Sequence, residues 1–174
     1  NYIQYYLKVN PDNKIKAYFE KTLTNIATSG IVDHLEGGFY RYTVDSEWKI
    51  PHFEKMLYDN AQLLSLFSNA FKETQNPLFK STVYALYDFL QKRMKSNLGA
   101  FYAAIDADNN EGEGRYYVFN RAHLEEIGAA DLELMLDFYR IDLDQPFEES
   151  FYHLRKNENL TTLMTKYGLT AEAL

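Results

Sequence analysis

Apolar residues recur at helical spacing along much of the chain and predict a mainly α-helical protein. In the stretch 12–29 they form one stripe, which consists of Ile15, Tyr18, Phe19, Leu23, Ile26 and Ala27. This is the spacing of a helix that buries one face. The following glycine, Gly30, is a natural end for that helix. The pattern predicts further helices at about 51–73, 77–96, 121–127, 130–140 and 158–167.

Local signals support several of the predicted helix ends. Pro51 and Pro77 suit the first turn of a helix, where a missing N–H is not needed for a hydrogen bond. Asn120 is a preferred capping residue in front of the helix at 121–127. Thr170 is placed in the same way before Ala-Glu-Ala-Leu, so another helix is expected to begin at 171–174.

The connections between the helices are rich in glycine and aromatic residues. The first connection, GIVDHLEGGFYRYTVDSEWKIP, contains a short predicted strand near 39–44. In a later connection, the stretches 100–105 and 115–119 alternate between apolar and polar residues and flank an acidic turn. This arrangement predicts a small β-hairpin near 100–119.

A short motif occurs twice in these connections. GGFY at 37–40 recurs as GAFY at 99–102, 62 residues later (99 − 37), and Asp45 and Asp106 follow the two copies at nearly matching offsets. Each copy comes after one helix and before the next. A repeat of about 60 residues that contains paired helices predicts a ring or stack of helical hairpins, because one hairpin alone cannot bury its apolar faces. Two copies are also compatible with coincidence.

Polar residues at helical spacing mark the predicted helix at 51–73 as the first candidate site. His52, Lys55, Asp59 and Gln62 fall at i, i+3, i+7 and i+10 on a helix that is otherwise mostly apolar. A helix that is apolar over most of its surface is expected to be buried. The polar stripe then faces either a narrow strip of solvent or a polar lumen, and we expect the lumen.

The residue types in and before this stripe suit the binding and turnover of a polar ligand. His52 is suited to act as a general base, and Asp45 with Asp59 are candidates for the two carboxylates of a glycoside hydrolase. Trp48 would be a platform for a sugar ring, and Tyr40, Arg41 and Lys55 would be further ligand contacts. The alternatives are ordinary: a core tryptophan, a hydrogen-bonded histidine at a helix start, and a surface pair of Lys55 with Asp59.

Composition removes several classes of function. The 18 basic and 25 acidic residues give a net charge of −7, which argues against a nucleic acid or an anionic membrane as partner. The chain has no cysteine, so disulfides and thiol catalysis within it are excluded. No run approaches about 18 apolar residues, so no membrane-spanning helix is expected. We expect a cytoplasmic protein, since no signal peptide is visible.

The sequence predicts neither a metal site nor a cofactor. The acidic stretch 106–113 resembles the start of a calcium loop, but that loop needs Gly at its sixth position and Glu at its twelfth. Glu111 and Tyr117 stand there instead. His34, His123 and His153 have no ligand spacing and are interpreted as structural or exposed. No glycine-rich nucleotide motif is present.

Two longer stretches resemble the signatures of one family. GGFYRYTVDSEW at 37–48 with PHFEKMLYDN at 51–60 is the first, and AIDAD at 104–108 with EGEGRYYVF at 111–119 is the second. They resemble the thioredoxin-domain-containing family of spermatogenesis-associated protein 20 and its bacterial homologues. The resemblance covers roughly residues 15–155.

The resemblance implies an architecture. Members are longer and carry a thioredoxin-like domain followed by an (α/α)6 toroid similar to N-acylglucosamine 2-epimerases and six-hairpin glycosidases. Residues 1–174 would be a single fragment, the first part of that toroid, so the fold expected is a partial (α/α)6 toroid of helical hairpins. The thioredoxin-like domain and the later hairpins would be absent, and exposed hairpin faces would favour self-association.

The resemblance leaves the activity open. The chain would belong to a carbohydrate-active domain of the sugar epimerase, isomerase or glycosidase type, with a sugar or another small polar molecule as ligand. The fragment alone would be inactive. The alternative is a non-catalytic binding or scaffold module that is coupled to the thioredoxin-like domain in the full-length protein. The family supplies no catalytic residues that could be transferred to this chain.

Overall fold

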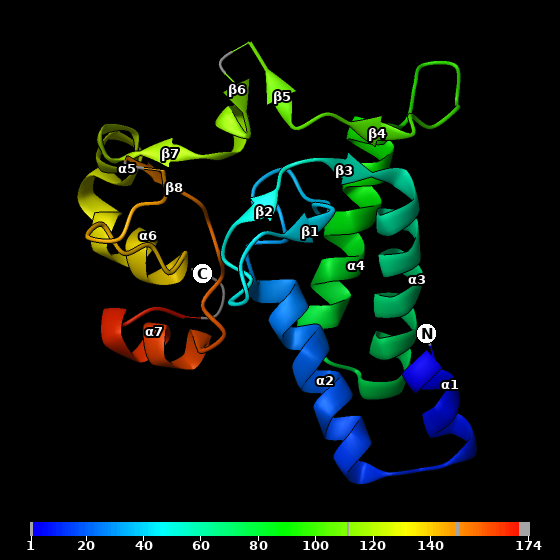
Figure 1. Cartoon of the computed structure of the whole chain (residues 1–174). Helices are drawn as coiled ribbons and strands as arrows, with labels where there is room; N and C mark the ends of the chain where they lie inside the picture. The colour runs from blue at the N-terminus through cyan, green and yellow to red at the C-terminus, as the bar shows by residue number, and fades with distance from the viewer. Residues whose placement is uncertain (1, 111, 149, 171–174) are drawn as a thin grey trace.

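The computed structural model describes residues 2–110, 112–148 and 150–170. Its N-terminal half is a group of helices, which lie on the right of Figure 1: α1 (Tyr2–Val9), α2 (Asn13–Thr28), α3 (Leu57–Thr74) and α4 (Pro77–Phe89). A π-helical turn (Leu90–Met94) continues α4. Among the described residues the C-terminal half holds three short helices, on the left of Figure 1: α5 (Arg121–Gly128), α6 (Leu132–Phe138) and α7 (Leu160–Tyr167). The mainly helical fold is therefore confirmed.

Capping and packing explain the helices that the pattern predicted. Asp12 caps α2 by accepting hydrogen bonds from the N–H groups of Lys14 and Ile15. Most of the apolar stripe of α2 packs with α3 and α4 in one core, whereas Tyr18, predicted in the same stripe, is exposed. The buried members of this core are Phe19, Leu23, Ala27, Phe39, Phe67, Ala70, Phe79, Leu86, Phe89, Leu90 and Met94. Asn120 caps α5 as predicted, through the N–H of His123. The helix expected after Thr170 lies outside the described residues.

Short antiparallel strand pairs join distant parts of the chain (Figure 1). The pairs are β1 (Tyr42–Thr43) with β2 (Pro51–His52), β3 (Lys55–Met56) with β4 (Ala104–Ile105), β5 (Asp108–Asn109) with β6 (Gly112–Glu113), and β7 (Phe119–Asn120) with β8 (Phe151–Tyr152). The pairing of β3 with β4 places the two glycine-aromatic connections side by side. The C-terminal half contains the pair of β7 with β8 and two 3₁₀ turns, at Arg115–Tyr117 and Ala129–Asp131.

Two predictions about these connections were wrong. The helix expected from Pro51 begins only at Leu57, because 51–52 and 55–56 are strands that pair with β1 and β4. His52, Lys55, Asp59 and Gln62 therefore share no helical face. The stretches 100–105 and 115–119 do not pair with each other: β4 pairs with β3 and β7 with β8, and the actual hairpin, β5 with β6, is smaller. In both cases pairing with a distant segment decided a structure that local pattern left open.

The internal repeat is visible in the backbone. In the first copy, the Tyr40 N–H donates to the Ile31 carbonyl at 2.8 Å and the Gly37 N–H to Asp33 at 3.1 Å. In the second copy, the Tyr102 N–H donates to Met94 at 2.8 Å and the Gly99 N–H to Ser96 at 2.9 Å. Isolated bridges join Val32 to Phe39 and Lys95 to Phe101. The two segments, 31–40 and 94–102, are called the first turn and the second turn below.

A second, smaller core links the first turn to the C-terminal half. Its buried residues are Tyr40, Phe53, Ala107, Tyr117 and Val118. Tyr40 meets Phe53 and Tyr117 edge to face at ring-centroid distances of 5.2 and 5.1 Å, a favoured aromatic geometry. No helix in the described part of the chain is long and apolar enough to cross a membrane.

Candidate functional site

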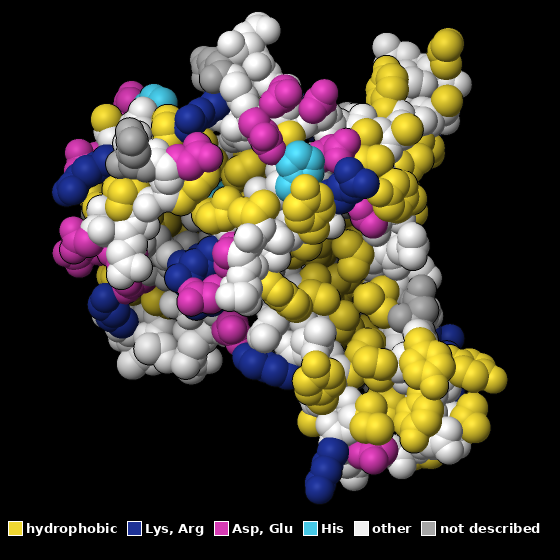
Figure 2. Space-filling model, in the orientation of Figure 1, with side chains coloured by type: hydrophobic (Ala, Val, Ile, Leu, Met, Phe, Trp, Pro, Cys, Tyr) yellow, Lys and Arg dark blue, Asp and Glu magenta, His cyan; other side chains and the backbone are white. Residues whose placement is uncertain are grey.

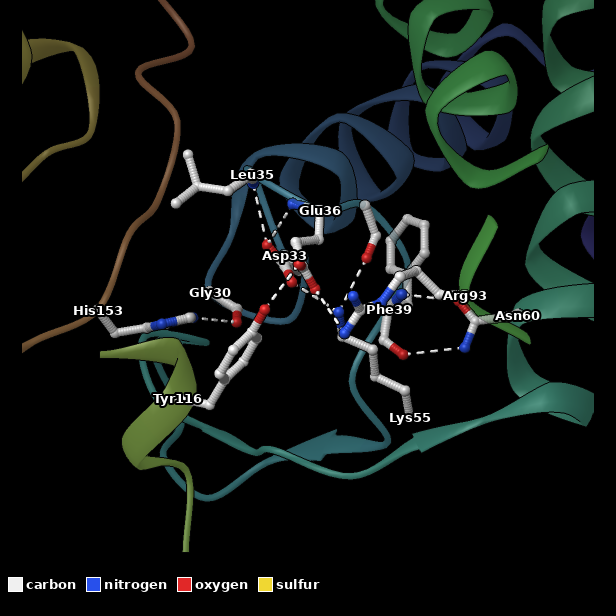
Figure 3. A network of polar contacts seen from close by, with 11 residues as sticks. Gly30, Asp33, Leu35, Glu36, Phe39, Lys55, Asn60, Arg93, Tyr116 and His153 are labelled. Carbon is white, nitrogen blue, oxygen red and sulfur yellow. Dashed lines mark hydrogen bonds and ion pairs between the residues drawn. The ribbon is translucent and has the colours of Figure 1, made fainter. Parts of the chain in front are cut away.

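A buried ion pair lies at the centre of the polar network around the first turn (Figure 3). The Lys55 Nζ donates to Asp33 Oδ2 at 2.6 Å and to the Gly37 carbonyl at 2.9 Å. Only 1% of Lys55 and 7% of Asp33 is exposed to solvent. A buried pair of this kind needs every polar atom satisfied, because both charges have lost their hydration.

The surroundings of the pair supply the remaining contacts. Asp33 Oδ1 accepts hydrogen bonds from the N–H groups of Leu35 and Glu36 at 2.9 and 3.0 Å. The Lys55 ammonium lies 5.0, 4.8 and 4.8 Å from the ring centroids of Tyr40, Phe89 and Tyr117 respectively, within cation–π range. Burial lowers the pKa of Lys55, and the charge of Asp33 opposes that shift.

Asn60 forms a second clamp on the first turn. Its Oδ1 accepts from the Phe39 N–H at 2.7 Å, and its Nδ2 donates to the carbonyls of Phe39 and Met56 at 3.0 and 2.8 Å. Asn60 is fully buried. The stretch PHFEKMLYDN thus holds GGFY in place through Lys55 and Asn60, which is a structural reason for these residue types in the signature.

A cavity of about 200 Å³ adjoins this network and is the candidate ligand site. It is called the acidic pocket below, and its lining is Asp33, His34, Leu35, Glu36, Tyr40, Tyr116, Tyr117, Phe119, His153 and Leu154. Glu36 Oε1 accepts from the Tyr116 hydroxyl at 2.8 Å, and Glu36 Oε2 lies 3.2 Å from the Arg93 guanidinium. Figure 3 shows these contacts converging from segments that are far apart in the sequence.

Burial sets the protonation of the other polar groups in the pocket. It lowers the pKa of His34 to about 4, although a hydrogen bond to the Ser29 carbonyl opposes the shift. Burial also lowers the pKa of His153, whose Nε2 donates to the Gly30 carbonyl at 2.7 Å. It raises the pKa of Tyr117 to about 12. At neutral pH the pocket therefore offers neutral imidazoles and protonated tyrosines beside two carboxyl groups.

A second place, a cluster around Glu54, holds His52, Arg41 and Asp59. His52 Nδ1 lies 2.8 Å from Glu113 Oε1, and its ring stacks on Tyr42 at 5.0 Å. The Arg41 guanidinium donates to Glu54 at 3.0 Å. Burial raises the pKa of Asp59. The charge of Arg41 opposes this shift, and the charge of Glu54 adds to it.

Asp45 and Trp48 lie in a third place, the loop between β1 and β2. The Asp45 carboxylate accepts hydrogen bonds from the N–H groups of Glu47, Lys49 and Ile50 at 2.6–3.1 Å. Burial alone would raise the pKa of Asp45, but these hydrogen bonds together lower it. Asp45 therefore shapes the turn that presents Trp48.

The structure thus divides the seven predicted residues among three places. Tyr40 lines the acidic pocket, with Lys55 buried beside it, and the other five lie elsewhere. Sequence reasoning missed Asp33, Glu36 and Tyr116. The available signal was weak: Asp33 precedes the first GGFY by four residues, and Tyr116 lies in the second signature, 80 residues from Glu36. Within the described residues, no group of three or more potential ligands is placed to hold a metal ion.

Comparison with known proteins places the chain among longer relatives. It is 37% identical to an uncharacterized protein of Caenorhabditis elegans over 139 residues, 71% of this chain and 19% of that protein. It is 36% identical to spermatogenesis-associated protein 20 of Homo sapiens over 112 residues, 61% of this chain and 14% of that protein. The match to the Rattus norvegicus protein of that name is 40% over 93 residues. No family model matches the chain.

The chain therefore spans less than a fifth of the length of these relatives. Identities of 36–40% over half of the chain or more support a relationship with the family of spermatogenesis-associated protein 20.

Proposed function

We propose that the chain is part of a carbohydrate-active domain and binds a neutral, polyhydroxylated ligand in the acidic pocket. The observation that carries this proposal is the lining of the cavity, which combines two carboxyl groups, Asp33 and Glu36, with the three tyrosines Tyr40, Tyr116 and Tyr117. Sites for small ligands are concave and largely apolar, with a few placed polar groups. The pocket has both properties.

The chemistry of the lining favours hydroxyl groups over charged ones. A carboxylate has about four acceptor positions and can take hydrogen bonds from ligand hydroxyls in addition to its internal ones. Tyrosine rings offer an apolar face together with a polar tip. An anionic ligand would meet Asp33 and Glu36, whose own cations, Lys55 and Arg93, are already paired with them.

We propose binding and not catalysis for this segment. The sequence favours Asp45, His52 and Asp59 for acid–base catalysis. In the part of the chain that the structure describes, none of them lines the acidic pocket. Glycoside hydrolysis needs two carboxyl groups on either side of the scissile bond. In the proposed (α/α)6 toroid, further hairpins of the parent protein would supply the missing groups.

A thermal-shift screen of the chain with neutral monosaccharides and disaccharides tests this function. We expect at least one sugar to raise the melting temperature, and Glu36→Gln to abolish that shift because it weakens the acceptor beside Tyr116. Glu125→Gln, on the exposed side of α5, is the matched control and should keep the shift. The proposal fails if no neutral sugar binds, or if both variants behave alike.

A scaffold function is the second candidate, and exposed aromatic side chains favour it. The most exposed aromatic residues are Tyr2, Tyr5, Tyr18 and Tyr84 on the helices, and the aliphatic Leu98 on the second turn is also exposed. Figure 2 shows hydrophobic side chains gathered over the region of α1. Under this proposal the helical faces pack against further hairpins in the parent, and the isolated chain self-associates through them. A single monomeric mass in light scattering at high protein concentration would argue against it.

A further inference from the structure

We propose a second ligand site, in which Arg140 and Arg155 bind a carboxylate or phosphate group of a small organic anion whose body packs on Trp48. The site is a groove between the loop at 45–50 and the C-terminal segment, and it is called the arginine groove below. It consists of cavities of about 420 and 580 Å³, which share Glu47, Arg140 and Arg155. Trp48 lines the first of these cavities.

The pairing of the arginines singles out this groove. The chain has six arginines, and four of them form ion pairs with carboxylates: Arg41 with Glu54, Arg93 with Glu36, Arg115 with Glu148, and Arg121 with Glu125. Among the described residues, no carboxylate lies within ion-pair distance of the other two, Arg140 and Arg155. In a chain with seven more acidic than basic residues, two adjacent arginines without a carboxylate partner are unexpected.

Nearby acids are engaged elsewhere. Glu47 pairs with Lys49, and Glu158 pairs with Lys21 at 2.6 Å. The carboxylate of Asp45 is taken up by backbone N–H groups of its own loop. The guanidinium of Arg155 is oriented by a hydrogen bond that its Nη2 donates to the Arg140 carbonyl at 3.0 Å. A planar guanidinium held in this way is suited to bind a carboxylate or phosphate.

The backbone around the groove is also unusual. Trp48 and Arg140 have φ values of +57° and +52°, in the left-handed region that residues with side chains rarely adopt. Such conformations cost free energy and concentrate at functional sites. The Trp48 loop is fixed by the Gly30 N–H, which donates to the Trp48 carbonyl at 2.8 Å. A Cβ atom at Gly30 would lie 1.9 Å from the Lys49 carbonyl oxygen, so only glycine allows this approach.

One further polar atom in the groove lacks a partner. Asn25 Oδ1 is buried and accepts no hydrogen bond from the described residues, and Asn25 lines the same cavity as Trp48. Buried acceptors are almost always paired. A hydroxyl or amide donor on the body of the ligand would satisfy this oxygen. The expected ligand therefore combines an anionic group, a ring and a hydrogen-bond donor, as a sugar phosphate or a sugar acid does.

Trp48 provides the measurement, since it is the sole tryptophan in the chain. We would titrate the protein with glucose 6-phosphate, glucuronate, inorganic phosphate and neutral glucose and follow the tryptophan fluorescence. At least one anionic sugar should give a saturable change that weakens with added salt, and glucose should not. The relative affinities of the first two probes show whether phosphate or carboxylate is preferred.

Variants separate the groove from non-specific effects. Arg155→Gln and Arg140→Gln should each weaken binding at least tenfold, and Arg140→Lys should weaken it in part because it loses the forked donor geometry. Arg121→Gln, an exposed arginine elsewhere, should leave the affinity unchanged. Arg140 is exposed, so its variants remain informative if Arg155→Gln does not fold. The proposal is overturned if no anion gives a saturable change, or if the Arg140 variants bind as the unchanged protein does.

Discussion

The first and second turns share a pattern of backbone hydrogen bonds, although the second turn is one residue shorter, and they differ in what surrounds them. Both follow a helix, both carry a glycine with positive φ before the aromatic pair, and both close with equivalent hydrogen bonds. In the first turn Phe39 and Tyr40 are each 1% exposed, whereas in the second Phe101 and Tyr102 are 42% and 56% exposed. The difference teaches that the motif encodes a chain reversal, and that neighbouring segments decide whether this reversal becomes a core.

What covers the first turn is the signature stretch that follows it. Lys55 and Asn60 bind its backbone, and α3 covers Phe39 through Phe67, with ring centroids 5.8 Å apart. At the position of Asp33 the second turn carries Ser96, so it offers no carboxylate for a buried cation. The four predictions below test this contrast, from the largest expected effect to the smallest.

The ion pair should be the most sensitive point of the first turn. Lys55→Met leaves the Asp33 carboxylate buried without its cation, and we expect a loss of about 3–5 kcal/mol in the free energy of unfolding. Adding Asp33→Asn to this variant removes the unpaired charge and should restore part of the loss. Urea unfolding followed by circular dichroism measures both. Equal stability of Lys55→Met and the unchanged protein would contradict a buried pair.

Truncating the equivalent phenylalanines compares the two turns directly. Phe39→Ala removes a fully buried ring and should cost about 3–5 kcal/mol. Phe101→Ala, at the matching position of the second turn, should cost less than about 1 kcal/mol, because the ring is half exposed. Urea unfolding followed by circular dichroism measures the loss of stability in both variants. Similar losses for the two variants would show that the second turn is covered in solution.

The first turn should also make stability depend on pH through His34. Its pKa in the folded state is about 4, below the ordinary value of 6.5, because burial disfavours the charged ring. The stabilisation is fully present above pH 6.5 and is lost as pH falls through 4, since the unfolded chain takes up the proton first. This contribution amounts to up to about 3 kcal/mol.

The control for His34 comes from the second turn, where Asn97 occupies the matching position. His34→Asn should flatten the dependence of the melting temperature on pH between 6.5 and 4. An unchanged slope in this variant would assign the dependence to other groups.

Glycine substitutions give the smallest expected contrast. Gly37 and Gly99 occupy matching positions and have φ values of +82° and +87°, so alanine is strained at both. A Cβ at Gly37 would lie 2.9 Å from the carbonyl oxygen of Ala85, whereas at Gly99 it would meet no atom of the described chain within 4 Å. Gly37→Ala should therefore lose about 1–3 kcal/mol more than Gly99→Ala. Equal melting temperatures would mean that the backbone at Ala85 moves aside without cost.

Much of the fold could be predicted where the structure depends on local signals. The stripe of α2, the cap at Asn120 and the proline after Asn76 each act through neighbouring residues, and the helices they predict are present. The start of α3 could not be predicted in this way. Residues 51–56 have a sequence that suits a helix, but their hydrogen bonds go to β1 and β4.

The candidate site was less predictable because its residues come from distant segments. Tyr40, which the sequence predicts as a ligand contact, lines the acidic pocket, but Glu36 and Tyr116 meet only through folding. The grouping of His52, Lys55 and Asp59 depends on a helical period that begins at Pro51. Once 51–56 form strands, His52 points to Glu113 and Lys55 to Asp33, on different sides of the same short segment.

By itself the sequence determined the helical class, the two glycine-aromatic turns and the cysteine-free, acidic character of the chain. These follow from residue type and from spacing within one or two helical turns. The tertiary structure decided which of the two turns is buried, that Lys55 is paired with Asp33, and that Arg140 and Arg155 meet the Trp48 loop. The physical reason is that burial, charge pairing and pocket shape depend on segments far apart in the chain, whose relative positions no local pattern encodes.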